Sequence, residues 1–228
     1  MTYDNICEGT FISRPNRFIA EVNISGKLTL CHVKNTGRCK ELLVPGAKVY
    51  LQRVAGETRK TDYDLIAVEK GERLVNMDSS APNKAVYEWL IGGASPIKRI
   101  GLIKPEVVFQ NSRFDFCINT TDGGVTFIEV KGVTLEEEGA VFFPDAPTLR
   151  GIKHIDELCR AADMGFNTVL LFVVQMQNVR YFSPNIKTHP EFKDALIRGR
   201  KAGVKLIAMD CVVTTNSMTI NKPVPIRL

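Results

Sequence analysis

The stretch that most constrains the fold is a pair of apolar segments that carry ionisable residues at their centres. The first segment reads S-R-F-D-F-C-I-N and the second reads V-T-F-I-E-V-K-G-V-T-L, with T-T-D-G-G between them. Apolar runs on either side of a glycine-containing turn predict a β-hairpin. Asp115 lies in the first strand, and Glu129 and Lys131 lie in the second. Because a buried carboxylate is costly unless it meets a cation or a metal, these residues indicate a site rather than a core.

The turn decides whether the three side chains share a face. Glu129 and Lys131 are two residues apart, so on a strand they lie on the same face. A two-residue turn at the Asp-Gly pair would place Asp115 opposite Val130, with its side chain on the wrong face. A three-residue loop over 121–123 would place Asp115 directly across from Glu129. The Asp-Gly pair favours the shorter turn, whereas a shared site needs the longer loop or a bulge.

The residue types suit one kind of chemistry. Two carboxylates supply hard oxygen ligands for Mg²⁺ or Mn²⁺, and a nearby ammonium can position water or stabilise developing negative charge. Together they fit metal-assisted phosphodiester hydrolysis. The competing interpretation is a structural ion pair between Lys131 and one carboxylate, because charged residues often protect the edge of a sheet. On these residues alone the two interpretations are equally well supported.

Composition narrows the class of protein. The chain has 228 residues, of which 44% are hydrophobic, so it has room for one large globular domain or two small ones. Lys and Arg number 30 against 25 Asp and Glu, which is compatible with a polyanionic partner. Six cysteines without a C-x-x-C pair favour reduced core thiols over disulfides or a zinc site. Neither a signal peptide nor a long apolar run is present, so we expect a cytoplasmic protein that does not enter a membrane.

Residues 1–82 predict a five-stranded β-barrel of the OB type. Short apolar runs recur at intervals of about ten residues, separated by glycine and asparagine breakers. The expected strands are Gly9–Arg14, Phe18–Ile24, Leu28–Val33, Ala47–Val54 and Tyr63–Val68.

Basic and polar residues cluster in the connections of this half. Arginine and asparagine beside a glycine-containing loop are suited to contact phosphate groups. The predicted nucleic-acid-binding residues are Arg14, Asn16, Arg17, Lys34, Asn35, Thr36, Arg38, Lys40, Arg59 and Lys60. On sequence alone, a set of solvated turns is the simpler explanation.

After residue 82, strands and helices alternate, which predicts a mixed α/β sheet with helices on its faces. We expect helices over 84–91, 148–164 and 190–202, and strands over 106–110, 168–175, 179–182 and 205–213 besides the hairpin. Asn83 is predicted to cap the first helix and Asp145 to help cap the second. The last eight residues contain two prolines and are predicted to be irregular.

Three helical residues have both a functional and a structural interpretation. Glu88 could reach the carboxylate site from the first helix, although a surface glutamate is the simpler explanation. Lys153 and His154 lie on the second helix, on the face next to its apolar stripe, and could contact phosphate. Alternatively, Lys153 and Glu157 are four residues apart and could form an ordinary surface ion pair.

Several longer motifs resemble the sugar fermentation stimulation protein family. The resemblance covers the chain from near residue 8 to beyond residue 210, and its motifs are long and follow one another in order, which makes it specific. The motifs are R-P-N-R-F at 14–18, N-T-G-R at 35–38, S-R-F-D-F at 112–116, E-V-K-G-V-T-L at 129–135, F-P-D-A-P-T-L-R-G at 143–151 and K-H-I-D-E-L at 153–158.

The resemblance implies an OB-like nucleic-acid-binding domain over 1–82 and a restriction-endonuclease-like domain of the PD-(D/E)XK type over 83–228. It also implies DNA binding. In that superfamily a strand aspartate and the carboxylate of an E-x-K strand bind Mg²⁺, and the lysine supports the attack; Asp115, Glu129 and Lys131 match those positions. A helical glutamate sometimes joins the metal, and Glu88 is the local match. The chain departs from the pattern in having no proline before Asp115.

We therefore predict a nuclease that acts on DNA with Mg²⁺ or Mn²⁺. The predicted catalytic residues are Asp115, Glu129, Lys131, Lys153 and His154, and the predicted metal ligands are Asp115, Glu129 and Glu88. The alternative is a non-catalytic DNA-binding regulator of sugar (maltose) metabolism, because a nuclease fold does not guarantee nuclease chemistry. A third interpretation, an enzyme of small nucleotides, lacks support because the chain has no Walker loop or G-x-G-x-x-G run.

Overall fold

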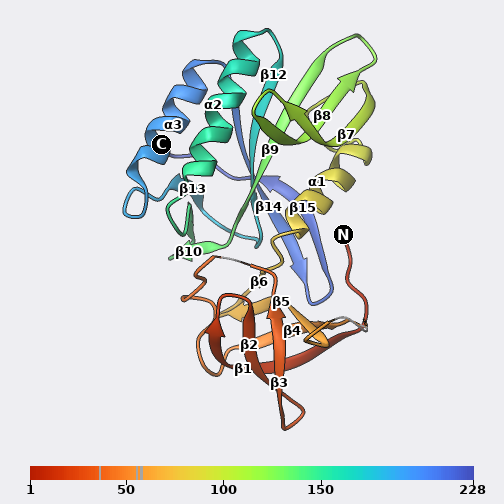
Figure 1. Ribbon diagram of the computed structural model, residues 1–228, viewed down its shortest axis with the longest axis vertical. Coiled ribbons are helices and arrows are strands. Elements are labelled where there is room, and N and C mark those ends of the chain that lie inside the picture. Colours follow the sequence, from red (N-terminus) through yellow and green to blue (C-terminus); the bar gives the residue numbers. More distant parts are fainter. Residues whose placement is uncertain (36, 55, 57–58) are drawn as a thin grey trace.

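The computed structural model describes residues 1–35, 37–54, 56 and 59–228. A β-barrel forms one end of the molecule and a helix-flanked sheet forms the other (Figure 1). Over the described residues, no helix is both long and apolar enough to cross a membrane. All six cysteines are free thiols, as predicted, and four of them are buried.

Five strands close the N-terminal barrel, and a sixth extends it. Neighbouring strands are antiparallel in the order β3-β2-β1-β4-β5-β6, and a parallel pairing of β3 with β5 closes the barrel. This confirms the predicted OB-type architecture. The sequence did not predict β6, which is only four residues long and follows a glycine turn. The strands are β1 (Ile6–Asn16), β2 (Ile19–Ile24), β3 (Lys27–Val33), β4 (Lys48–Arg53), β5 (Tyr63–Lys70) and β6 (Arg73–Asn76).

The connection from the barrel to the second unit is short. Strand β6 ends at Asn76, and helix α1 (Ala81–Ile91) begins five residues later. The helix starts before the predicted position because Pro82 is tolerated in a first helical turn, where its missing N–H is not needed. The prediction that Asn83 caps this helix is therefore wrong, since Asn83 lies inside it. A domain boundary between residues 82 and 83 stays a prediction.

The second unit is built on a six-stranded mixed sheet in the order β15-β14-β12-β9-β8-β7. Strands β9, β12 and β14 are parallel, and the outer strands pair antiparallel with them. The tail was predicted to be irregular, but its first three residues belong to β15, an edge strand that tolerates a proline at its end. The strands are β7 (Ile100–Phe109), β8 (Ser112–Thr120), β9 (Val125–Val133), β12 (Asn167–Val174), β14 (Lys205–Thr214) and β15 (Ser217–Pro223).

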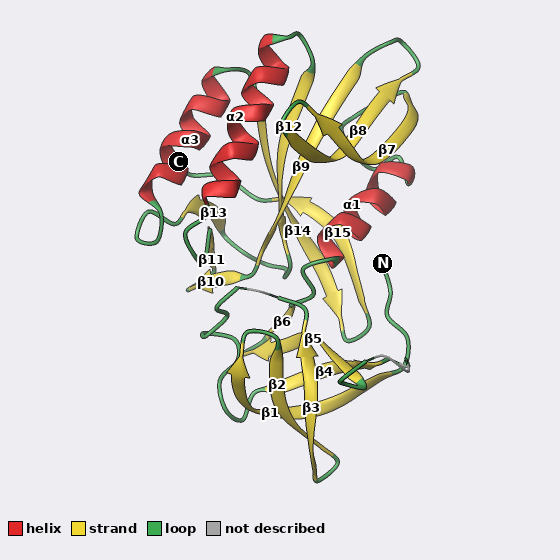
Figure 2. Ribbon diagram, viewed as in Figure 1, coloured by secondary structure: helices red, strands yellow, loops and turns green. Residues whose placement is uncertain are grey.

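Helices cover both faces of this sheet. Helix α1 lies on one face, and α2 (Leu149–Asp163) and α3 (Pro190–Lys201) lie on the other (Figure 2). Alternate residues of β12 pack into the two cores: Phe172 and Val174 face the α2 side, whereas Leu171 and Val173 face α1. This explains why β12 reads as a continuous apolar run.

A small sheet is formed by two strands that lie between β9 and α2 in the chain and a third strand that follows α2. Strands β10 (Leu135–Glu137), β11 (Ala140–Phe143) and β13 (Tyr181–Pro184) form it. The segment from Pro144 leads to Thr148, whose hydroxyl accepts a hydrogen bond from the backbone N–H of Gly151 at 3.0 Å and caps α2. Asp145 was predicted to help this cap, which is wrong. Its Oδ2 instead accepts a hydrogen bond from the backbone N–H of Arg38 in the barrel, at 2.9 Å.

Candidate active site

The hairpin between β8 and β9 adopts the register that a shared site needs. The pairs run from Asn119–Val125 to Phe116–Ile128. The backbone N–H of Thr120 donates to the carbonyl of Gly124 at 2.8 Å, which closes a three-residue loop over 121–123. Gly123 takes the left-handed conformation that this loop requires, with φ +88. Extending the register by one residue places Asp115 opposite Glu129.

The strands separate where Asp115 lies, since the paired residues end at Phe116. The backbone N–H of Val130 donates to Oδ2 of Asp115 at 2.7 Å instead of to a neighbouring strand. Oδ1 of Asp115 accepts from the side-chain amide of Asn83 on α1 at 2.8 Å. Within a strand the N–H and C=O of one residue point to the same side, so the carbonyl of Val130 also faces this opening.

Burial raises the pKa of Asp115, and the nearby negative charge of Glu129 raises it further. The hydrogen bonds from Val130 and Asn83 act in the opposite direction but do not outweigh these effects. Asp115 therefore resists ionisation, since its ionised form is disfavoured beside a second carboxylate. A cation placed between the two carboxylates would remove that resistance.

Glu129 is only 2% exposed, and its two oxygens have different surroundings. Oε1 accepts a hydrogen bond from Nζ of Lys131 at 2.5 Å and contacts Nδ1 of His154. Burial alone would raise the pKa of Glu129, but the His154 hydrogen bond and the Lys131 charge hold it below its ordinary value. Oε2 is buried and has no hydrogen-bond partner. Such an oxygen is rare in folded proteins and calls for an explanation, of which a bound water or ion is one.

His154 comes from α2, and Arg150 one turn earlier fixes its ring. Nε2 of His154 lies 3.3 Å from Nε of Arg150. Because arginine can only donate, we assign the His154 proton to Nδ1, where it faces Glu129. Neither Arg150 nor Asn83 was identified from the sequence as a site residue. The four-residue spacing of Arg150 and His154 was the available signal for Arg150.

Two predicted site residues lie elsewhere. Nζ of Lys153 donates to the carbonyl of Asn111 in the β7–β8 turn at 2.9 Å, so it does not join the cluster. The alternative ion pair of Lys153 with Glu157 does not form either, because Glu157 binds Arg160 at 2.6 Å. The carboxylate of Glu88 contacts the amino nitrogen of Met1. Among the described residues, no three or more His, Cys, Asp and Glu side chains are grouped to hold a metal.

Three of the predicted nucleic-acid-binding residues instead hold the barrel loops together. The guanidinium of Arg14 donates at 2.7–2.9 Å to four backbone carbonyls, those of Arg17, Asn35, Gly37 and Arg38. The Asn16 side chain accepts from two backbone N–H groups, and the Asn35 side chain accepts from that of Gly37 at 2.8 Å. The Arg14 guanidinium and the side-chain oxygens of Asn16 and Asn35 therefore hold turns in place, and a contact of these residues with nucleic acid stays a prediction.

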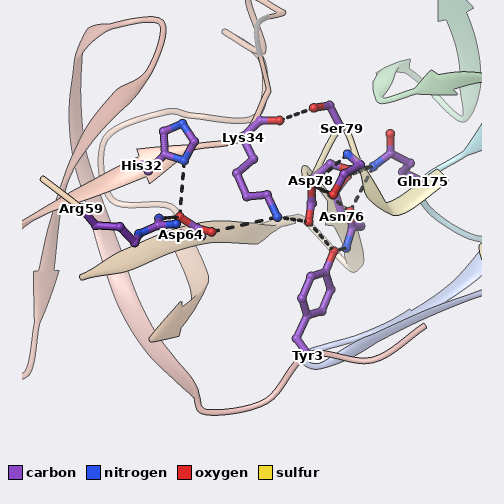
Figure 3. A network of polar contacts seen from close by, with 10 residues as sticks. Tyr3, His32, Lys34, Arg59, Asp64, Asn76, Asp78, Ser79 and Gln175 are labelled. Carbon is purple, nitrogen blue, oxygen red and sulfur yellow. Dashed lines mark hydrogen bonds and ion pairs between the residues drawn. The ribbon is translucent and has the colours of Figure 1, made fainter. Parts of the chain in front are cut away.

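Two further cations of this set belong to a polar network at the junction of the two units (Figure 3). Nζ of Lys34 lies 2.6 Å from Oδ2 of the fully buried Asp78, and Arg59 pairs with the buried Asp64. The amide of Gln175, just after β12, donates at 3.0–3.1 Å to oxygens of Asn76 and Asp78. Lys34 and Arg59 therefore compensate internal carboxylates, which cannot be buried unpaired.

The remaining members of the set are four exposed cations and one residue outside the described part. Arg17, Arg38, Lys40 and Lys60 are exposed, and Arg17 lies over the ring of Phe18 at 5.0 Å. Thr36 lies outside the described residues. A contact of these residues with nucleic acid stays a prediction.

Comparison with known proteins agrees with both halves of the fold. Residues 12–77 match the family model of the SfsA N-terminal OB domain, and residues 80–217 match that of the sugar fermentation stimulation protein RE domain. The chain is 54% identical over 228 residues to a sugar fermentation stimulation protein homolog of Desulfitobacterium hafniense (strain Y51), covering 100% of this chain and 99% of the relative. It is 53% identical to one from Ruminiclostridium cellulolyticum, covering 100% of both.

A solved structure has the same fold along the whole chain. The structure of Pyrococcus furiosus SfsA in complex with Ca²⁺ matches with a TM-score of 0.91 and 27% sequence identity, covering 100% of this chain and 98% of that one. The predicted pairing of an OB domain with a restriction-endonuclease-like domain is therefore confirmed. The chain belongs to the sugar fermentation stimulation protein family.

Proposed function

We propose that this protein hydrolyses phosphodiester bonds in DNA with the help of a divalent metal ion. The observation that carries the proposal is the second oxygen of Glu129, which is buried and unpartnered beside a carboxylate whose pKa is raised. Oε2 of Glu129 is a ligand atom that the fold itself leaves unused, and Asp115 lies beside it at the point where two strands separate, with its oxygens held by Val130 and Asn83. A purely binding protein has no need of an acidic pair near a polyanion.

Asp115, Glu129 and the Val130 carbonyl would hold the ion. All three supply the oxygen atoms that Mg²⁺ and Mn²⁺ prefer. The relative from Pyrococcus furiosus was solved in complex with Ca²⁺, another hard cation, which supports a divalent metal in the family. When bound, the ion supplies Lewis-acid stabilisation of the negative charge that develops on the phosphate.

Three other residues have roles that follow from their contacts. The ammonium of Lys131 can hold an attacking water by a hydrogen bond or stabilise developing charge, because it lies beside the carboxylate pair. His154 is a positioning residue that fixes Oε1 of Glu129. Arg150 is exposed next to His154 and can contact a phosphate of the bound strand. The four exposed barrel cations would contact the same strand farther from the site.

Cleavage of defined substrates tests the proposal. Single-stranded, double-stranded and branched DNA, together with RNA, are incubated with Mg²⁺ or Mn²⁺ and wild type, Lys131→Ala or Glu129→Gln. Lys153→Ala is the matched control, because it removes a lysine that lies outside the site. We expect cutting of DNA by wild type and the control only. Cutting by all variants alike, or by none while all bind DNA, would reject the proposal.

The second candidate function is DNA binding without cleavage. It is favoured by the ion pairs that already engage Glu129 and Glu88, and by the lack of a three-ligand cluster among the described residues. Binding through the barrel alone would weaken steeply with salt and would not respond to metal. Binding that requires Mn²⁺ and is lost in Asp115→Asn would instead favour the first function.

A further inference from the structure

A cleft of about 530 Å³ begins at Asp115 and extends between α1 and the β7–β8 pair. Its walls include Asn83 and Tyr87 from α1, Pro105 from β7, and Phe116 from β8. The volume is in the range of small-molecule sites. None of the chemistry proposed for Asp115 and Glu129 uses this space.

The cleft has an aromatic wall that can stack with a flat ring. The rings of Tyr87 and Phe116 are 6.4 Å apart and nearly parallel, at 21°. Phe116 is buried, whereas Tyr87 is 43% exposed. An exposed aromatic ring supported by a buried one is the arrangement on which nucleic-acid-binding proteins stack bases.

The polar groups of the cleft suit a base better than a phosphate. The Asn83 amide nitrogen is held by Asp115, which leaves the side-chain oxygen of Asn83 as an acceptor for a base edge. Glu88 and Glu106 also line the cleft. Each is already paired with a cation, Glu88 with the amino group of Met1 and Glu106 with Arg113 at 2.9 Å. The second oxygen of each carboxylate can still accept a hydrogen bond from the amino group of a base. Lys84 is exposed on the same helix and can meet the backbone of a strand.

We propose that this cleft takes an unpaired nucleobase of the DNA strand whose phosphate lies at Asp115 and Glu129. The proposal rests on the proposed function and deepens it by naming how the strand is positioned. A base that stacks on Tyr87 while its phosphate lies at the carboxylates cannot remain paired in a duplex. The base comes either from a single strand or from a duplex that releases one nucleotide.

Binding of DNA with and without a base tests the cleft directly. The affinity of the full-length protein for a single strand is measured by fluorescence anisotropy with Ca²⁺, and again for the same strand with abasic nucleotides. Wild type, Tyr87→Ala and Tyr87→Phe are compared, with Ile91→Ala as the control for an exposed apolar residue on the same helix but outside the cleft.

We expect Tyr87→Ala to bind the normal strand roughly tenfold more weakly, the effect of losing one stacked base. Tyr87→Phe and Ile91→Ala should bind as wild type does. Abasic nucleotides should weaken wild type but not Tyr87→Ala. An equal abasic penalty in both, or unchanged affinity in Tyr87→Ala, would overturn the proposal, as would an absence of DNA binding by wild type.

Fluorescence of a duplex with 2-aminopurine at one position shows whether the base comes from a single strand or from a duplex. A rise in its fluorescence on binding indicates release from the duplex, whereas binding confined to single strands indicates that source. The two proposals can fail separately. If the protein cuts DNA but Tyr87→Ala binds as wild type does, only the cleft proposal is rejected. If Tyr87→Ala binds more weakly but wild type does not cut, only the proposed hydrolysis is rejected.

Discussion

The junction of the two units and the hairpin site both contain buried carboxylates, but they differ in whether every carboxylate oxygen has a hydrogen-bond partner. At the junction, Oδ1 of Asp78 accepts two hydrogen bonds from Ser80. Oδ2 accepts from Lys34 at 2.6 Å and from the Tyr3 hydroxyl at 3.3 Å (Figure 3). At the site, Oε2 of Glu129 has no partner. A saturated carboxylate holds structure, and an unsaturated one keeps the capacity to bind a cation.

The pKa directions of the two aspartates follow the same division. Burial alone would raise the pKa of Asp78, but the bonds from Lys34 and Ser80 hold it below its ordinary value. Burial raises the pKa of Asp115, and the charge of Glu129 adds to the effect. The junction is therefore stabilised by its ionised aspartate, whereas the site is destabilised by its own.

The two regions also touch. The backbone N–H of Gln175 donates to the carbonyl of Val133 at 2.9 Å, at the end of the strand that carries Glu129 and Lys131. A Cβ at Gly132 would lie 2.5 Å from Oε1 of Gln175. The junction thus packs directly against the site strand, which fixes the barrel relative to the carboxylates.

The largest expected effect is at the junction. Asp78→Ala would leave the Lys34 ammonium and the Tyr3 hydroxyl without their acceptor. We expect the free energy of unfolding to fall by about 3 kcal/mol, the lower end for a broken buried pair because the Lys34 side chain is 23% exposed. Denaturant unfolding measures it, with the exposed Asp122→Ala as the control. A loss no larger than that of the control would contradict the structural role of Asp78.

The next effect concerns activity. Lys131→Ala should slow DNA cleavage by about 100-fold or more, because the ammonium acts beside the reacting phosphate. Lys153→Ala should cut at the rate of wild type, since its Nζ binds the Asn111 carbonyl. The rates are measured under single-turnover conditions. Equal losses in both variants would show that general basic charge, and not the position at Glu129, supports the reaction.

A smaller effect is expected where the two regions meet. Gly132→Ala would place a methyl group against Gln175 Oε1 at 2.5 Å and against Pro82 at 3.0 Å. We expect a loss of about 1–3 kcal/mol in the free energy of unfolding from overpacking. A thermal unfolding series with Gly132→Ala, Gln175→Ala and the double variant measures it. If the two losses simply add, the side chain of Gln175 is not what limits the space at Gly132.

The smallest effect is expected at Asp115. Because its pKa is raised above the ordinary 3.8, the folded protein binds the proton more tightly than the unfolded chain. At a pH above the raised pKa, the ionised Asp115 therefore lowers the free energy of unfolding. This loss disappears as the pH falls through the raised pKa toward 3.8. Asp115→Asn should leave the free energy of unfolding at pH 7 unchanged or slightly higher, and any gain should vanish at low pH.

Asp78 should show the opposite pH dependence of the free energy of unfolding to that of Asp115. Its pKa lies below 3.8, so its stabilisation is complete above that value and is lost as the pH falls through the lowered pKa. Unfolding of wild type, Asp115→Asn and Asp78→Asn between pH 2 and 7 measures both. A destabilising Asp115→Asn at pH 7 would mean that the site carboxylate is structural.

The sequence predicts the site better than its surroundings, for a physical reason. Asp115, Glu129 and Lys131 are conspicuous because ionisable residues are rare inside apolar strands. The Asp-Gly pair favoured a two-residue turn, so the three-residue loop that the structure adopts was the less favoured of two open possibilities. Asn83 was missed because its contact with Asp115 is a tertiary contact across 32 residues.

The basic loops are harder to interpret from the sequence. A cation on a predicted turn can meet solvent, phosphate or a buried carboxylate, and the sequence does not distinguish these. Lys34 meets Asp78, which is 44 residues away in the chain, and Arg14 meets backbone carbonyls. Only the folded chain brings these partners together, so charge in a loop does not by itself predict a contact with nucleic acid.

Calorimetric titration with Mn²⁺ tests most directly whether Asp115 and Glu129 form a cation site. Wild type, Asp115→Asn, Glu129→Gln and the exposed-hairpin control Asp122→Asn are titrated at pH 7. The account predicts one binding event in wild type and in the control, and a loss of at least tenfold in affinity in the two site variants. Binding that is absent from wild type, or equally strong in all four proteins, would contradict it.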